Sequence, residues 1–217
     1  MTKPSFGVGV DRWFVENGYD KPCGTVHVGV NDGCELGWYL QEGQVPILGF
    51  EPENSSFKSA TESFNVEIGV GLIKLYRYAL SDKSDLGTLK IPERKTTGEW
   101  ATQGSSFLNE LHLGDEYHVR THCFMRLHRF DELVQKEKWD MSLYNLLVID
   151  VQGMELQVLK GFGDYLNGFK YLVVECSDPP IYESEAPAQE VIDFLRGKEF
   201  KQMTPTLSHN DILFLKQ

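Results

Sequence analysis

The sequence lacks any apolar stretch long enough to span a membrane, and its first six residues lack the long apolar core of a signal peptide. These two absences predict a cytoplasmic protein that does not insert into a membrane. Positive charge is scarce as well, because 21 Lys and Arg stand against 32 Asp and Glu, which gives a net charge of −11. No run of basic residues is present to grip phosphate groups, so we expect no nucleic acid partner.

Cysteine is sparse and poorly placed for metal binding or cross-linking. The four cysteines contain no C-x-x-C pair, so they predict neither a zinc site nor a disulfide framework. Four histidines follow one another in one part of the sequence: His112, His118, His122 and His128. Their spacings match no ligand pattern on a single element, so we predict no metal site from them.

Repeated β–α units are the main pattern that the sequence does contain. Short apolar runs, such as the Leu-Leu-Val-Ile of residues 146–149, alternate with helical stripes, which predicts an α/β fold. The expected strands cover residues 25–28, 46–50, 73–80, 146–149 and 171–174. The expected helices cover residues 12–17, 35–42, 54–63, 127–138, 155–162 and 188–196. Residues 200–203 and 212–215 predict a C-terminal antiparallel hairpin, so the expected sheet is doubly wound and mostly parallel.

Residues 81–125 interrupt this alternation. They contain a turn cluster, a polar loop over residues 96–106 and an expected strand over residues 118–124. The segment is too short to bury a core of its own. We therefore interpret it as an insertion folded over one edge of the sheet, inside a single domain of residues 1–217.

Polar residues follow the strong apolar runs, where ligands of a parallel sheet collect. The first run opens into a glycine loop, Gly29-Val30-Asn31-Asp32-Gly33, and the others end at Glu51, Asp150 and Glu175. A glycine loop between strand and helix, followed by a carboxylate about 20 residues later, is typical of a nucleoside-cofactor site. Taken singly, the glycines also suit a tight turn, and Glu51 and Asp150 also suit helix caps.

The composition of the glycine loop bears on which cofactor is bound. A dinucleotide loop has the pattern G-x-G-x-x-G, since its helix must receive a pyrophosphate. Here the middle glycine is absent and Asp32 adds negative charge, which repels a pyrophosphate and attracts a sulfonium and an amino group. The loop therefore favours S-adenosylmethionine over NAD.

Several motifs together resemble the FkbM family of methyltransferases. They are residues 27–33, 50–52, 79–82, 171–175, 211–214 and above all 149–161, Ile-Asp-Val-Gln-Gly-Met-Glu-Leu-Gln-Val-Leu-Lys-Gly. The resemblance covers about residues 25 to 215. It implies a class I, Rossmann-like methyltransferase fold that binds S-adenosylmethionine and O-methylates a sugar hydroxyl of a glycan or a glycosylated metabolite.

The resemblance also implies roles for individual residues. Gly29, Asn31 and Gly33 are expected at the methionine part of the cofactor, Glu51 at its ribose, Leu80 near its adenine and Asp150 at the centre of the reaction rim. Two positions depart from the family pattern. His27 stands where the family usually has an acidic residue, and Gln152 stands where Glu is common. We retain His27 and Asp32 among the candidate cofactor-binding residues.

A sugar hydroxyl is a poor nucleophile at neutral pH, so methyl transfer to it calls for a general base. Asp150 is the first candidate, followed by Glu175 and His122. Asp150 equally suits ordering the cofactor amino group, and His122 also suits a plain strand position. Asp150 with Glu175 is an alternative Mg²⁺ site, but we do not favour a divalent metal.

The insertion is the expected acceptor wall or lid. Its polar loop combines Trp100 with hydroxyls and the amide of Gln103, which is how proteins hold sugars. A carbohydrate or glycosylated small molecule is therefore the expected partner. Two alternatives stay open, an NAD-linked oxidoreductase and a non-catalytic module that binds an adenosine cofactor. The sequence makes no prediction of oligomeric state.

Overall fold

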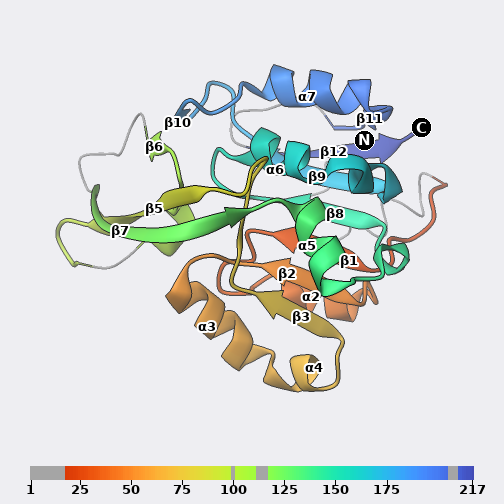
Figure 1. The fold of residues 1–217 in the computed structure, drawn as a ribbon, viewed down its shortest axis with the longest axis horizontal. Helices are drawn as coiled ribbons and strands as arrows, with labels where there is room; N and C mark the ends of the chain where they lie inside the picture. Colours follow the sequence, from red (N-terminus) through yellow and green to blue (C-terminus); the bar gives the residue numbers. More distant parts are fainter. Residues whose placement is uncertain (1–17, 99–100, 111–116, 205–209) are drawn as a thin grey trace.

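A computed structural model describes residues 18–98, 101–110, 117–204 and 210–217, so the expected helix over residues 12–17 lies outside the described residues. A central sheet has seven strands in the order β11-β12-β9-β8-β1-β2-β3 (Figure 1). Their bounds are β1 (Thr25–Val28), β2 (Ile47–Phe50), β3 (Ile73–Tyr76), β8 (Leu146–Ile149), β9 (Tyr171–Cys176), β11 (Phe200–Gln202) and β12 (Asn210–Lys216). Strands β3, β2, β1, β8 and β9 run parallel, and β12 is antiparallel to both of its neighbours. Of these seven strands, β12 is therefore the one that is reversed.

Helices cover both faces of this sheet, because alternate residues of its strands point to opposite sides. In β8, Leu147 and Ile149 belong to one apolar cluster, and Leu146 and Val148 belong to the other. The first cluster contains residues of α5 (Phe130–Glu137), α6 (Glu155–Gly161) and α7 (Ala188–Gly197). The second contains residues of α2 (Leu36–Gln41) and α3 (Asn54–Ser63), which α4 (Asn65–Gly69) follows. The predicted α/β, doubly wound, mostly parallel fold with a C-terminal antiparallel pair is confirmed.

Two predicted elements have different limits in the structure. The expected strand over residues 73–80 is two strands, since β3 ends at Tyr76 and β4 (Ala79–Leu80) pairs with β7 (Tyr117–His128) in another sheet. β3 is the edge strand of the central sheet, and the chain leaves the sheet after it. At this point the rings of Tyr76 and Tyr78 stack, with their centroids 5.6 Å apart. The stripe over residues 127–138 also divides, because Leu127 belongs to β7 and the helix begins at Phe130.

The insertion forms a ribbon that extends away from the central sheet (Figure 1). Strand β5 (Leu86–Arg94) pairs antiparallel with β7, and β4 completes a three-stranded sheet. A short 3₁₀ turn, η1 (Thr102–Gly104), lies between β5 and β6 (Asn109–Glu110). β6 pairs with β10 (Tyr182–Glu183), so the ribbon meets the chain that follows β9. Two further 3₁₀ turns are η2 (Met141–Leu143) and η3 (Gly163–Gly168).

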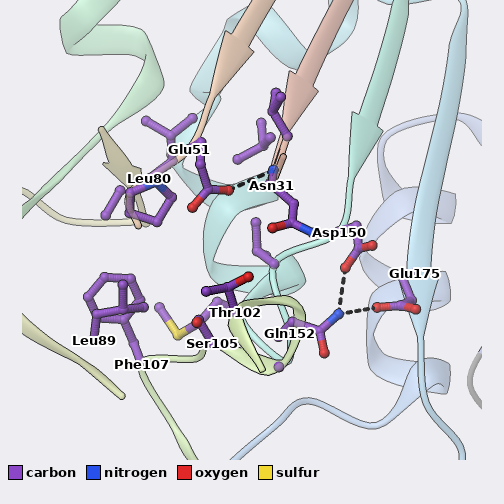
Figure 2. A pocket seen from close by; sticks show the side chains of 18 of the residues that line it. Asn31, Glu51, Leu80, Leu89, Thr102, Ser105, Phe107, Asp150, Gln152 and Glu175 are labelled. Carbon is purple, nitrogen blue, oxygen red and sulfur yellow. Dashed lines mark hydrogen bonds between the residues drawn. The ribbon is translucent and has the colours of Figure 1, made fainter. Parts of the chain in front are cut away.

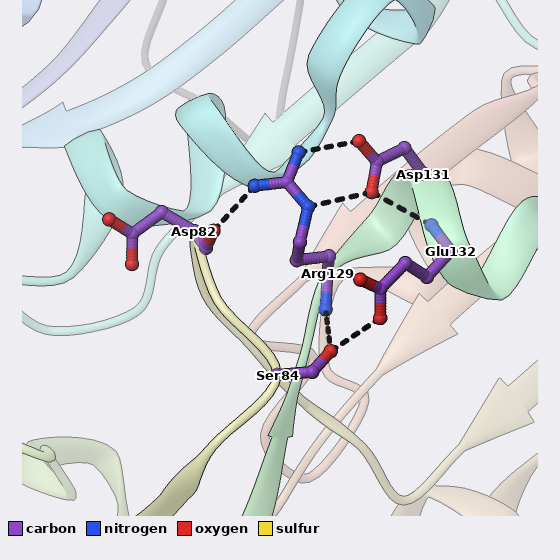
Figure 3. A network of polar contacts seen from close by, with 5 residues as sticks. All are labelled: Asp82, Ser84, Arg129, Asp131 and Glu132. Carbon is purple, nitrogen blue, oxygen red and sulfur yellow. Dashed lines mark hydrogen bonds and ion pairs between the residues drawn. The ribbon is translucent and has the colours of Figure 1, made fainter.

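A polar network fixes the base of the ribbon to the sheet domain (Figure 3). The Arg129 guanidinium donates to both carboxylate oxygens of Asp131, at 3.0 and 2.5 Å, and to the backbone carbonyl of Asp82. Ser84 donates to Glu132 at 2.5 Å and accepts from the Arg129 N–H. The hydrogen bond to Asp131 raises the pKa of Arg129, so the guanidinium stays charged. The network therefore joins the segment that follows β4, at Asp82 and Ser84, to the start of α5.

Candidate functional site

A cavity of about 520 Å³ lies at the carboxyl ends of β1, β2, β8 and β9 (Figure 2). This volume lies in the range of about 300–1,000 Å³ that is usual for small-molecule sites. Glu51 and residues of the glycine loop line one end of the cavity, and residues of the ribbon line the other end. After the roles that the sequence predicts for them, we call these the cofactor end and the acceptor end. Asp150, Gln152 and Glu175 lie between them.

The glycines of the loop serve the packing of the chain itself. Gly29 has a φ of +94°, and a Cβ atom there would lie 1.7 Å from the carbonyl oxygen of Asp150. Gly33 has a φ of +87°, and its Cβ would lie 3.1 Å from Ala60 and Phe64. Gly29 thus lets the loops after β1 and β8 touch, and Gly33 lets the loop lie on α3.

Glu51 is buried at the cofactor end and holds two loops together. Its carboxylate accepts the Asn31 N–H at 2.8 Å and the Glu53 N–H at 2.7 Å. Desolvation raises the pKa of Glu51 to about 7, although these two hydrogen bonds oppose the shift. Glu51 is not the cap of α3, because Glu53 is the N-cap and accepts the Ser56 N–H at 2.7 Å.

Gln152 joins the two carboxylates on one side of the cavity (Figure 2). Its Nε2 donates to Asp150 at 2.7 Å and to Glu175 at 2.9 Å, and its Oε1 accepts from the Tyr182 hydroxyl at 2.8 Å. Gln152 has a φ of +56°. Burial first, and the nearby Asp150 charge second, raise the pKa of Glu175, so Glu175 holds a proton at neutral pH. The amide therefore brings Asp150 and Glu175 into one cluster without a third negative charge.

A further carboxylate, Glu155, organises the loop that carries Asp150. It is buried, and it accepts the N–H groups of Val151 at 3.2 Å and Gly153 at 3.0 Å. Burial raises the pKa of Glu155 to about 7. The N-cap of α6 is Met154, so Asp150 does not cap that helix. Asp150 is instead positioned at the cavity by the close contact between its backbone and Gly29.

The structure brings six of the predicted site residues to the cavity and leaves others outside its lining. Those that line it are Gly29, Asn31, Glu51, Leu80, Asp150 and Glu175. Gly33 packs on α3, and Asp32 is exposed and accepts the Cys34 N–H at 3.1 Å. The backbone of His122 pairs with Lys90 in the ribbon, and its side chain lies outside the described residues.

His27 is 1 % exposed and lies in the core rather than on the cavity. Its Nδ1 is 3.1 Å from the Tyr39 hydroxyl, and its Nε2 is 3.4 Å from the carboxylate of Glu35. Glu35 does line the cavity, at the start of α2. A carboxylate is therefore present near the end of β1, although it comes from the residue before α2 and not from position 27.

Several lining residues were missing from the sequence-based prediction. Glu35, Tyr78, Phe107 and Tyr182 all line the cavity. A carboxylate at the start of the helix after the glycine loop was a usable signal for Glu35. No local signal identified Phe107 or Tyr182, because both reach the cavity through the pairing of β6 with β10 and of β5 with β7.

The acceptor end is formed largely by the ribbon. Leu89, Thr102, Ser105 and Phe107 line it, and Ser105 Oγ is buried with no hydrogen-bond partner among the described residues. Ser106 is engaged elsewhere, since it donates to the backbone carbonyl of Gln152 at 2.6 Å. Trp100 and the side chain of Gln103, two members of the predicted polar loop, lie outside the described residues.

The described lining is acidic. Glu35, Glu51, Asp150 and Glu175 line the cavity, and none of its described lining residues is Lys, Arg or His. In the part of the chain that the structure describes, no group of three or more His, Cys, Asp or Glu side chains is arranged to hold a metal ion. Across the same residues, no helix has both the length and the apolar character needed to cross a membrane.

Comparison with known proteins places this site in a family. A curated relative, the 2-O-methyltransferase NoeI of Sinorhizobium fredii, is 25% identical over 98% of this chain and 87% of its own length. The ribosomal protein L11 methylase of Lactobacillus delbrueckii subsp. bulgaricus aligns over 100% of this chain and 81% of its own, with a TM-score of 0.50 and 11% identity. An rRNA methylase of Streptococcus thermophilus aligns over the whole of both chains, with a TM-score of 0.49 and 9% identity.

At such low identity, the solved structures concern the fold alone, which is that of class I methyltransferases. The family evidence is independent of them. The model of the methyltransferase FkbM domain matches residues 26–202, which is more than half of the chain and includes both the glycine loop and the Asp150 motif. The chain belongs to the FkbM methyltransferase family.

Proposed function

We propose that the protein transfers a methyl group from S-adenosylmethionine to a hydroxyl of a carbohydrate. The observation that carries this proposal is the acidic cavity at the strand ends, with no described basic residue in its lining. A cofactor with a sulfonium and an amino group suits such a lining, whereas a pyrophosphate is repelled by it. Glu35, Glu51 and Asp150 provide the negative charge of the lining, and Asp32 lies outside it. Family membership also argues against an NAD-linked oxidoreductase.

The residues of the cofactor end fit the parts of this cofactor. Glu51 is the proposed acceptor of hydrogen bonds from the ribose hydroxyls, and Leu80 is the proposed neighbour of the adenine. Gly29 and Asn31 present the loop backbone to the methionine part, and Glu35 lies where it can receive the amino group. When bound, S-adenosylmethionine supplies an electrophilic methyl group.

Asp150 is the proposed general base. It lies between the two ends of the cavity, and Gln152 orients its carboxylate through the 2.7 Å hydrogen bond. Glu175 is a weaker candidate, because its raised pKa keeps it protonated at neutral pH. A base aligned with the acceptor hydroxyl contributes about 10²–10⁴ to the rate. His122 stays a prediction from the sequence.

Two observations support a hydroxyl acceptor. The relative that matches over almost the whole chain is named a 2-O-methyltransferase, and an oxygen acceptor is carried over from it at 25% identity. Thr102 and Ser105 also line the acceptor end, together with the apolar Leu89 and Phe107. Sugars offer this same combination of hydroxyls and apolar ring faces.

Calorimetry tests the cofactor, and radiolabel transfer tests the reaction. The purified protein should bind S-adenosylmethionine and S-adenosylhomocysteine but not NAD. It should then move a labelled methyl group onto glycans extracted from its host, with a methyl-mass shift in mass spectrometry. Failure to bind either sulfur compound contradicts the proposal. Binding of both without methyl transfer to any glycan favours a non-catalytic adenosine-binding module instead.

A further inference from the structure

His27 has a buried ring nitrogen that lacks a hydrogen bond. The residue is 1 % exposed and lies in the middle of the sheet, where β1 pairs with β2 at Gly49 and with β8 at Val148. Its Nε2 makes no hydrogen bond among the described residues. A carboxylate oxygen of Glu35 lies 3.4 Å from Nε2, slightly beyond the usual hydrogen-bond range of about 2.7–3.2 Å. Because a buried polar group without a partner is unfavourable, the Glu35 carboxylate is well placed to become its acceptor.

Tyr39 determines which nitrogen of His27 carries the proton. Its side chain is buried, and its hydroxyl lies 3.1 Å from Nδ1. Burial, followed by the charge of Glu35, raises the pKa of Tyr39 well above its ordinary value, so the hydroxyl keeps its proton and can donate to Nδ1. A carboxylate only accepts hydrogen bonds. The neutral ring therefore accepts at Nδ1 and donates from Nε2 toward Glu35.

Helix α2 brings both partners of His27 to the same side. Glu35 is the N-cap of the helix and Tyr39 follows four residues later, with the Tyr39 N–H donating to the Glu35 carbonyl at 3.2 Å. Residues four apart on a helix lie one above the other. The Glu35 side chain is 40 % exposed and lines the cavity. Since a carboxylate has two oxygens, Glu35 can accept from His27 and from a ligand at the same time.

We propose that Tyr39 and His27 form a buried hydrogen-bonded chain that positions the Glu35 carboxylate for the amino group of S-adenosylmethionine. The Tyr39 hydroxyl donates to Nδ1 of His27, and Nε2 donates to Glu35. His27 and Tyr39 are positioning residues and do not touch the cofactor. This inference rests on the proposed function and deepens it, because it names the residues that hold the acceptor of the amino group in place.

Nitrogen NMR of the ligand-free protein tests this chain without any turnover. Isotope-labelled histidine in mildly alkaline buffer reports which ring nitrogen is protonated, and the signals of His27 are those lost in His27→Gln. We expect a protonated Nε2 and an unprotonated Nδ1. In Tyr39→Phe the ring loses its donor, so this preference should weaken. A His27 ring protonated on Nδ1 in the unmodified protein would overturn the proposal.

Calorimetry compares S-adenosylhomocysteine with its analogue that lacks the amino group. His27→Leu removes the donor to Glu35, so it should weaken binding of S-adenosylhomocysteine about tenfold and leave binding of the analogue unchanged. His27→Gln retains an N–H at a similar reach and should restore most of the affinity. Equal losses for both ligands in His27→Leu would indicate a purely structural role and overturn the proposal.

Tyr39→Phe should weaken binding of S-adenosylhomocysteine about threefold, because it acts only through the ring of His27. Tyr171→Phe is the matched control. Tyr171 is also a buried tyrosine, and its hydroxyl donates to the Asp20 carbonyl at 2.6 Å, outside the cavity. This control should leave the binding of both ligands unchanged. A loss in the control as large as that in Tyr39→Phe would contradict the assigned role of Tyr39.

Glu35→Gln shows whether His27 acts through Glu35. It should weaken binding of S-adenosylhomocysteine about tenfold, and adding His27→Leu should then cost little more, because both side chains serve one interaction. Additive losses would overturn the proposal. Since Glu35 is half-exposed, Glu35→Gln gives this answer for the amino group even where His27→Leu fails to fold.

The unmodified protein separates the two hypotheses. If it binds neither S-adenosylhomocysteine nor the analogue, the proposed function itself fails. If it binds both equally well, the proposed function stands and the inference about Glu35 and its supporting residues is wrong.

Discussion

The two ends of the cavity are built on different principles. At the cofactor end, the Glu51 carboxylate accepts N–H groups of two loops, and Gly29 lies against the backbone after β8. At the acceptor end, Ser105 and Phe107 come from a ribbon that pairs with the chain after β9 and is tied to the domain at its base by Arg129. The cofactor end is thus part of the sheet, whereas the acceptor end is attached to it.

Because of this difference, we expect substitutions at the two ends to change different properties of the protein. A change at the cofactor end should alter both cofactor binding and the stability of the fold, since the same contacts serve both. A change in the ribbon or its anchor should alter acceptor use and leave cofactor binding unchanged. Asp150 lies where the two ends meet, so it should affect turnover and neither binding equilibrium.

The largest effect is expected from Asp150→Asn. Asparagine keeps the shape and still accepts the Gln152 amide, but it cannot take a proton. Turnover should fall by about 10²–10⁴ while the affinity for S-adenosylhomocysteine changes little. Steady-state kinetics and calorimetry on the same samples check this, with Asp193→Asn on α7 as the control. Equal losses in affinity and turnover would show that Asp150 binds the cofactor instead.

Gly29→Ala should be the most destabilising single change at the cofactor end. A Cβ would lie 1.7 Å from the Asp150 carbonyl oxygen, and φ is +94°. Strain and overpacking together should cost about 2–4 kcal/mol of unfolding free energy. Gly43→Ala is the matched control, because Gly43 also has a positive φ, +70°, but has nothing within 4 Å of its added Cβ. Denaturant unfolding of both proteins should show the larger loss for Gly29→Ala.

Glu51→Gln should weaken S-adenosylhomocysteine binding by about 1–2 kcal/mol, since an amide accepts fewer hydrogen bonds than a carboxylate. The wild-type affinity should also rise with pH through about 7, the pKa of Glu51, as the carboxylate ionises. Calorimetry between pH 6 and 8 would measure both. A pH dependence that survives in Glu51→Gln would exclude Glu51 as its source.

Stability should respond to pH in the opposite direction. The pKa of Glu51 in the folded protein, about 7, is higher than its ordinary value of 4.5, so the folded state holds more protons between these values. The contribution of Glu51 to stability is present below about pH 4.5 and is lost as the pH rises through 7. The unfolding free energy should therefore be lower at pH 8 than at pH 6, and Glu51→Gln should reduce this difference.

The contrast between the two ends of the cavity also explains which parts of the site could be predicted from the sequence. The cofactor end follows from strand order, because the residue after each parallel strand lies on one edge of the sheet, which is why Gly29, Glu51 and Asp150 were identified. Phe107 and Tyr182 reach the cavity only through strand pairs between distant segments, and no periodicity in a single sequence encodes those pairings. His27 was misleading for a related reason. A strand residue next to a glycine loop can point either to the ligand or into the core, and here it packs on Tyr39.

The smallest effect is expected from Arg129→Lys, at the anchor of the ribbon. Lysine keeps the charge but cannot form the two parallel hydrogen bonds to Asp131 and the third to the Asp82 carbonyl (Figure 3). The unfolding free energy should fall by about 1 kcal/mol or less. The KM for the proposed sugar acceptor should rise while the affinity for S-adenosylhomocysteine stays unchanged. Arg196→Lys, in an exposed ion pair of α7, is the control. A parallel loss of cofactor affinity would show that the two ends of the cavity are coupled through the base of the ribbon rather than built independently.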